Sequence, residues 1–148
     1  MTGARKTEAK INEMAHFKAD CNGFLMHSVA LFSPDPHADT AVITHGWPES
    51  FLENYPVALE LFKSGRPLNI IIPSLPGYTF SARPPLDRDF DIFDAAELIN
   101  TLVAGLGIKT YVAVGGDIGS PVSTLLRAYP ECRGVHGRLF RARCAHAG

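Results

Sequence analysis

The sequence has few of the features that mark secreted, membrane-spanning or nucleic-acid-binding proteins. Its 148 residues include three cysteines, an odd number at wide spacing, which argues against a disulfide framework. The formal net charge is −1, so binding to nucleic acid through bulk positive charge is not expected. The longest apolar stretches have the length of a strand and fall short of the ~20 residues of a membrane span. The polar N-terminus has no signal-peptide pattern, so by elimination we expect a cytoplasmic protein.

The composition favours a folded globular chain. Hydrophobic residues make up 46% of the sequence and charged residues 20%, values that are ordinary for a folded domain and too apolar for a disordered one. We divide the chain into a polar N-terminal segment over 1–13, a partial α/β domain over 14–136 and an irregular basic tail over 137–148. Around the tail lie two cysteines and two histidines without the paired spacing of a zinc site, so we expect no metal there. They are Cys132, His136, Cys144 and His146.

The hydrophobic pattern predicts a hairpin followed by an α/β sheet. Two strand-like runs, 17–21 and 24–32, are joined by Asn22-Gly23, which favours a tight turn because both residues tolerate positive φ. After the hairpin, strands and helices alternate, which is the order of a parallel sheet with right-handed crossovers. The expected strands cover 41–44, 68–72, 111–114 and a final run that begins at 134, and the expected helices cover 50–63, 94–106 and 121–129. Asp94 and Glu97 have the spacing of a capping pair for the second of these helices.

The segment 115–120, with the sequence GGDIGS, follows one of the predicted strands and opens a helix. A sharp strand-to-helix elbow needs small residues two positions before and two positions after its central residue, and Gly115 and Gly119 flank Asp117 in this way. The nucleophile elbow of α/β hydrolases has the same context, with another residue at its centre. A carboxylate at a helix N-terminus stays ionised and can attack carbon. A glycine-rich turn capped by an acid fits this segment equally well.

A second segment, His45-Gly46-Trp47-Pro48, also comes directly after a predicted strand. A backbone amide from such a loop, together with the amide that follows the nucleophile, forms an oxyanion hole. This assigns the role to the amides of Trp47 and Ile118. His45, beside a glycine, is more typical of a buried structural histidine than of a base. A third segment, the proline-rich loop 73–81, follows the next strand at the same edge of the sheet.

Together, the three segments resemble those of the epoxide hydrolases of the α/β-hydrolase superfamily, in their microsomal-type branch, over about residues 11–136. The resemblance implies the N-terminal part of an α/β-hydrolase fold, without the lid and the C-terminal part. It also implies hydrolysis of a small-molecule epoxide to a vicinal diol through an aspartyl ester on Asp117, without a metal or an organic cofactor. The supporting loop residues would be His45, Gly46, Pro48, Gly115, Gly116 and Gly119.

Two related families fit the sequence less well. A haloalkane dehalogenase also has an aspartate nucleophile, but its halide site usually takes an N–H from a tryptophan side chain at the next position, where this chain has Ile118. A serine esterase would need a Gly-x-Ser-x-Gly motif, and the sequence has none.

The resemblance also implies that part of the catalytic apparatus comes from later segments of a longer chain. In the family, a base histidine, its acid partner and two lid tyrosines follow the elbow, whereas this sequence ends soon after Asp117. His136 and His146 are not expected to act as the base. We therefore expect a truncated hydrolase with little or no turnover. The alternative is a non-catalytic remnant, or a gene-model fragment, that acts by association through an uncovered apolar strand at the edge of the sheet.

Overall fold

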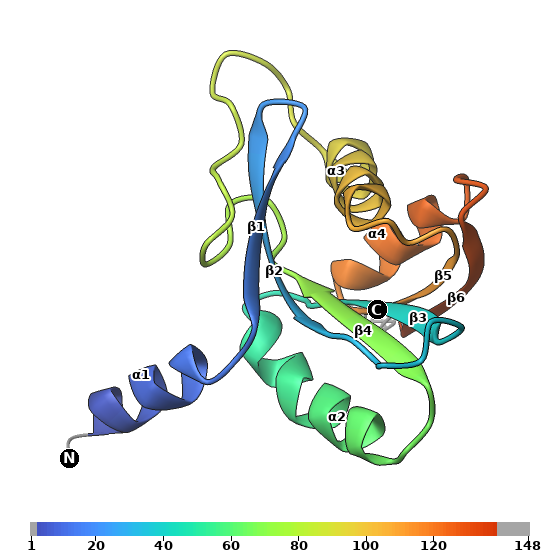
Figure 1. Ribbon diagram of the computed structural model, residues 1–148. Coiled ribbons are helices and arrows are strands. Elements are labelled where there is room, and N and C mark those ends of the chain that lie inside the picture. The colour runs from blue at the N-terminus through green and yellow to red at the C-terminus, as the bar shows by residue number, and fades with distance from the viewer. Residues whose placement is uncertain (1–2, 139–148) are drawn as a thin grey trace, which may run out of the picture.

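Within residues 3–138, which the computed structural model describes, six strands form one mixed sheet in the order β1-β2-β4-β3-β5-β6 (Figure 1). The strands are β1 (His16–Cys21), β2 (Phe24–Leu31), β3 (Asp39–Thr44), β4 (Leu68–Pro73), β5 (Tyr111–Gly116) and β6 (Cys132–Arg138). Strand β2 runs antiparallel to β1 and β4, and the strands β4, β3, β5 and β6 are parallel to one another. The α/β fold predicted from the sequence is therefore confirmed.

Helices cover both faces of the sheet. They are α2 (Phe51–Lys63), α3 (Ile92–Gly105) and α4 (Gly119–Leu126), whereas α1 (Gly3–Asn12) extends away from the sheet at the N-terminal end (Figure 1). Figure 1 shows α2 on one side of the sheet and α3 and α4 on the other. Successive residues of β4 point to opposite faces, so Ile71 packs in the core beneath α3 and α4, while Ile70 and Ile72 pack beneath α2. All three isoleucines are fully buried, which explains the continuous apolar run of this strand.

The predicted hairpin turn is confirmed. Asn22 and Gly23 have φ angles of 57° and 83°, the left-handed values that a tight two-residue turn requires. The Gly23 amide also donates a hydrogen bond of 2.6 Å to the carboxylate of Asp20. The turn aligns β1 with β2 and places His16 near His27, a pair that becomes important below.

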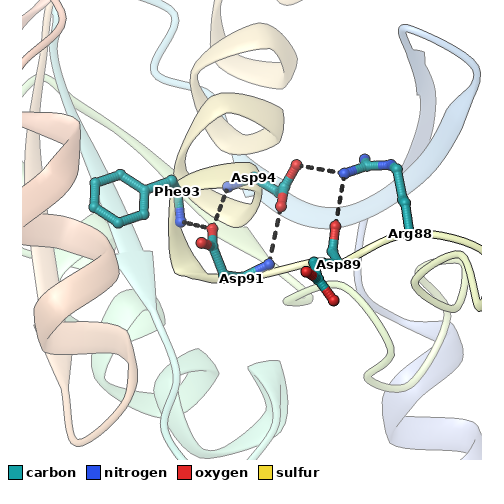
Figure 2. A network of polar contacts seen from close by, with 5 residues as sticks. All are labelled: Arg88, Asp89, Asp91, Phe93 and Asp94. Carbon is teal, nitrogen blue, oxygen red and sulfur yellow. Dashed lines mark hydrogen bonds and ion pairs between the residues drawn. The ribbon is translucent and has the colours of Figure 1, made fainter.

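The capping pair predicted for α3 is wrong by three residues. Asp91 is the N-cap, and its carboxylate accepts hydrogen bonds from the amides of Phe93 (2.8 Å) and Asp94 (3.3 Å) (Figure 2). Asp94 occupies the third helical position and accepts from the Asp91 amide at 2.9 Å. Arg88 adds an ion pair to Asp94 at 2.9 Å. The cap lies at Asp91 because its backbone is extended, whereas Asp94 is already helical.

At the N-terminal end of the described chain, part of the polar segment 1–13 forms helix α1. At the other end, Gly137 and Arg138, which the sequence placed in the tail, belong to β6, and the remainder of the tail, with Cys144 and His146, lies outside the described residues.

Strand β6 lies at one edge of the sheet as the structure describes it. Its residues Arg133, His136 and Gly137 are exposed, so this edge is not the apolar strand that the sequence led us to expect. Between residues 3 and 138, no helix has the length and apolar character needed to cross a membrane.

Candidate active site

The segments after β3, β4 and β5 meet at one edge of the sheet, because the three strands are parallel neighbours. Thr44, the last residue of β3, lies opposite Gly115 in β5. Just beyond them, the Trp47 amide donates a hydrogen bond of 2.8 Å to the Asp117 carboxylate. The fold thus brings together the two segments that the sequence singled out, although they are far apart along the chain.

Asp117 lies at the centre of a sharp turn between β5 and α4. Its φ angle is +50°, in the left-handed region that residues other than glycine rarely adopt. Such strain is characteristic of functional turns, where the surrounding structure holds a side chain in a fixed direction. The carboxylate is exposed at the start of α4.

Close packing explains why the elbow requires glycine on both sides of Asp117. A Cβ atom on Gly119 would lie 2.5 Å from the carbonyl oxygen of His45 and 2.8 Å from that of Thr44. A Cβ atom on Gly115 would lie 2.5 Å from the carbonyl carbon of Gly119. All three distances are shorter than real Cβ atoms show to backbone atoms. The neighbouring Gly116 has open space around it, so its lack of a side chain is not required in the same way.

The elbow is also held by a buried hydroxyl that the sequence reasoning missed. The Thr44 side chain donates toward the carbonyl oxygens of Val114 (3.1 Å) and Gly119 (3.0 Å), and it lies 2.8 Å from the Ser123 hydroxyl. These contacts tie the end of β3 to β5 and to the first turns of α4. A threonine at the end of a predicted strand carries no local signal of such a role.

The electrostatics of the site favour an ionised aspartate. Hydrogen bonds from the amides of Trp47 and Ile118 hold the pKa of Asp117 below its usual range. Asp117 is therefore a carboxylate at neutral pH, as a nucleophile must be. The same two amides are the ones that the sequence assigned to an oxyanion hole, so they are positioned to stabilise negative charge at this carboxyl group.

His45 is a structural histidine, as its position beside a glycine indicated. Its side chain is buried, Nδ1 donates to the Gly46 carbonyl at 3.0 Å, and Nε2 accepts from the Leu75 amide at 3.0 Å. With both ring nitrogens bonded, burial lowers the pKa of His45 and keeps it neutral. Gly46 must lack a side chain, since a Cβ atom there would lie 2.7 Å from the Cβ of Asp117. The Trp47–Pro48 peptide bond is cis.

A small apolar cavity of about 140 Å³ lies beside the elbow. Ile118 and Val122 of the elbow line one part of it, and Leu75, Tyr78 and Phe90 line another. The loop after β4 thus supplies part of an apolar wall beside the nucleophile candidate. His136, by contrast, lies exposed in β6, opposite Val114.

Comparisons with known proteins agree with this geometry. The profile of the alpha/beta hydrolase fold matches residues 41–136, and that of the epoxide hydrolase N terminus matches residues 4–54. The structure of Aspergillus niger epoxide hydrolase superposes with a TM-score of 0.87 and 40% identity, covering 97% of this chain and 39% of that one. Juvenile hormone epoxide hydrolase from Bombyx mori superposes with a TM-score of 0.82 and 28% identity, covering 91% of this chain and 38% of that one.

Juvenile hormone epoxide hydrolase 2 of Ctenocephalides felis is 34% identical over 147 residues, which cover 91% of this chain and 31% of that protein. The chain spans less than a third of the length of the curated relatives that it matches. The chain belongs to the epoxide hydrolase family of the α/β-hydrolase superfamily.

Proposed function

We propose that Asp117 is the nucleophile of an epoxide-opening reaction. The observation that carries this proposal is the position of its carboxylate, which a left-handed backbone presents at the start of α4 and which two amides hold in its ionised form. A carboxylate in this state can attack a strained ring carbon without a metal or a cofactor.

The first step transfers the epoxide to the protein. One oxygen of the Asp117 carboxylate forms a bond to a ring carbon, and the bond between that carbon and the ring oxygen breaks. The ring oxygen leaves as an alkoxide and takes a proton, which water can supply in this chain. The product is a hydroxyalkyl ester of Asp117, heavier than the free protein by the mass of one epoxide.

The second step would hydrolyse this ester, and here the described residues provide only part of what is needed. Water attacks the ester carbonyl, and the amides of Trp47 and Ile118 are positioned to stabilise the oxyanion that forms. A positioned general base typically accelerates such a step by about 10²–10⁴-fold. Such a base acts on the attacking water, and His45, the histidine on the segment that contacts the elbow, has both ring nitrogens bonded to other groups. We therefore propose that the chain forms the ester and releases the diol slowly or not at all.

The apolar pocket beside Ile118 favours an epoxide with a hydrocarbon substituent. The pocket is open to solvent, so it offers an apolar surface without limiting the size of that substituent. An epoxide such as 1,2-epoxyhexane could place its butyl group against Leu75 and Val122 while its ring faces Asp117.

Intact-mass measurement of the 148-residue chain after incubation with 1,2-epoxyhexane tests the proposal. We expect one added epoxide per chain, located on Asp117 by peptide mapping. Asp117→Asn should abolish the adduct while tolerating the left-handed backbone, since asparagine adopts such φ angles readily. Asp87→Asn is the matched control, because Asp87 is an exposed carboxylate outside the site.

The two hypotheses give different outcomes. A folded chain that gains no adduct, or gains it equally in the Asp117→Asn variant, would identify a non-catalytic remnant. Diol release over many turnovers that depends on Asp117 would contradict slow hydrolysis and show that a base acts in this chain.

A further inference from the structure

A pair of histidines, the buried His27 and the exposed His16, lies outside the site described above. His27 of β2 is only 1% exposed, and its Nε2 lies 2.8 Å from Nδ1 of His16 on β1. On the other side of the ring, Nδ1 lies 2.8 Å from the hydroxyl of Ser74. The rings of Phe51 and Phe80 enclose His27, each with its centre 5.1 Å from that of the imidazole. The pair therefore connects the N-terminal hairpin to the loop that follows β4.

If each ring carries one proton, the donor and the acceptor at each step of this hydrogen-bonded series follow from the backbone carbonyl at its start. The carbonyl oxygen of Ile11 can only accept, so His16 donates to it from Nε2 at 2.8 Å. A neutral His16 then accepts at Nδ1, which requires His27 to donate from Nε2. A neutral His27 in turn accepts at Nδ1 from the Ser74 hydroxyl. The Ser74 oxygen finally accepts from Thr79, 2.6 Å away.

With one proton on each ring, every donor and acceptor of the network has a partner. A proton on Nδ1 of His27 would reverse its bond to Ser74, because the ring would then donate to the Ser74 oxygen and the Ser74 hydroxyl would have to donate to Thr79. The titratable groups that act on His27 are His16 and Lys18, both on β1. Its neighbours from α2 and from the loop, Phe51, Phe80 and Ser74, carry no charge.

Ser74 begins a loop over 74–82 that is bonded internally and to β2. Its amide donates to the His27 carbonyl at 2.9 Å, and its own carbonyl accepts from the Ser81 hydroxyl at 2.7 Å. Across the loop, Gly77 donates to the carbonyl of Ala82 at 2.8 Å. The Ser81 hydroxyl also accepts from the His27 amide at 3.0 Å. His27 thus contacts this loop through its backbone and its side chain.

The loop in turn holds the segment that carries the oxyanion amide. Leu75, next to Ser74, donates its amide to Nε2 of His45, and the ring of Tyr78 packs on the same imidazole at 4.9 Å. His45 then donates to the carbonyl of Gly46, which precedes the Trp47 amide that binds Asp117. A continuous series of contacts therefore leads from His27 to the candidate nucleophile.

We propose that His27 is a positioning residue for Asp117, acting through Ser74, the loop 74–82 and His45 on the amide of Trp47. This inference rests on the proposed function for its catalytic consequence, but its structural part stands by itself. It assigns the N-terminal hairpin a role in the alignment of the site.

Substitutions that keep one nitrogen position of His27 at a time test this role. The Oδ1 of asparagine can replace the acceptor Nδ1, so His27→Asn should retain the bond from Ser74. The amide of glutamine replaces only the donor Nε2, so His27→Gln should lose that bond, and Ser74→Ala loses it from the other side. His37→Asn, at an exposed histidine outside the network, is the matched control.

Two measurements distinguish an effect on the position of the Trp47 amide from an effect on the reactivity of Asp117. In amide NMR spectra of the 148-residue chain, the Trp47 proton should move upfield in His27→Gln and Ser74→Ala, and remain in place in His27→Asn. The rate of adduct formation with 1,2-epoxyhexane should fall at least about tenfold in the first two variants, since small misplacements remote from the reacting atoms can cost up to about 10²-fold. An unchanged Trp47 resonance in folded His27→Gln and Ser74→Ala chains would overturn the proposal. If the Trp47 resonance moves as expected in the variants but the wild-type chain forms no adduct, only the proposed function is overturned.

The Asp117→Asn chain gives the same test without altering the network. Because it has no carboxylate at the elbow, the Trp47 resonance can respond to acid only through other groups. We expect that resonance to follow the protonation of His27, measured by long-range ¹⁵N NMR of its ring. If the Trp47 resonance does not follow the protonation of His27, the coupling between the two residues is contradicted. This result applies even if the His27→Gln and Ser74→Ala chains fail to fold.

Discussion

Alanine substitutions at Gly115 and Gly116, the two adjacent glycines before Asp117, test whether the fold excludes a side chain at the first position and tolerates one at the second. In Gly115→Ala, the new Cβ would lie 2.5 Å from the carbonyl carbon of Gly119, closer still to the oxygen of that carbonyl, and 2.6 Å from the Ser123 hydroxyl. Two of these atoms are backbone at the start of α4, so relief requires that the helix move away from β5. In Gly116→Ala, no atom lies within 4 Å of the new Cβ.

The expected magnitudes differ in sign as well as in size. Overpacking of a close contact costs about 1–3 kcal/mol, and the backbone contacts place Gly115→Ala at the upper end of this range. Gly116→Ala should be neutral or stabilise by about 0.4–1 kcal/mol, because alanine reduces the conformational freedom of the unfolded chain. The difference between the two variants should therefore be about 3 kcal/mol.

Urea unfolding followed by circular dichroism measures this difference. With a slope of about 1–3 kcal/mol/M, the midpoint of Gly115→Ala should lie at least about 1 M below that of Gly116→Ala. Adduct formation on Asp117 should decrease in the first variant only. Equal midpoints for the two variants would refute the claim that close packing of Gly115 against α4 determines the elbow.

Four further outcomes follow from the structure. Burial is the largest cause that lowers the pKa of His27 to about 4, and His16 and Lys18 lower it further. The unfolded chain therefore binds a proton at a higher pH than the folded chain does. Between about pH 6.5 and pH 4 the free energy of unfolding should decrease with falling pH, by about 3 kcal/mol from this group, and His27→Gln should reduce that slope in urea titrations. Ser50→Ala removes the capping box of α2 and should cost about 1 kcal/mol in the same assay. Gly23→Ala places a side chain at φ +83° in open space and should cost about 1 kcal/mol, measured as a lower Tm. Gly46→Ala should slow adduct formation, because its Cβ would displace the side chain of Asp117; an unchanged rate would contradict this.

The sequence alone predicted the features that depend on a few consecutive residues. The turn at Asn22-Gly23 follows from local backbone geometry. The spacing of the glycines two positions on either side of Asp117 was also visible in the sequence, although the close contacts that require Gly119 come from the distant residues Thr44 and His45. The order of strands and helices was also predictable, since buried parallel strands form apolar runs. Local signals were insufficient at α3, because Asp91 and Asp94 are both acids at suitable spacing. Only the extended backbone at Asp91 decides between them.

The tertiary structure alone decided which distant residues support the site. No local pattern indicates that Thr44 bonds the elbow, or that His27 accepts from Ser74, because these contacts cross between strands that are far apart along the chain. The strand order places β2 beside β4 and β4 beside β3, so the N-terminal hairpin, the loop 74–82 and the segment of His45 become neighbours. Hydrogen bonds act over about 3 Å in space and are indifferent to separation in sequence, so these partners emerge only once the sheet is assembled.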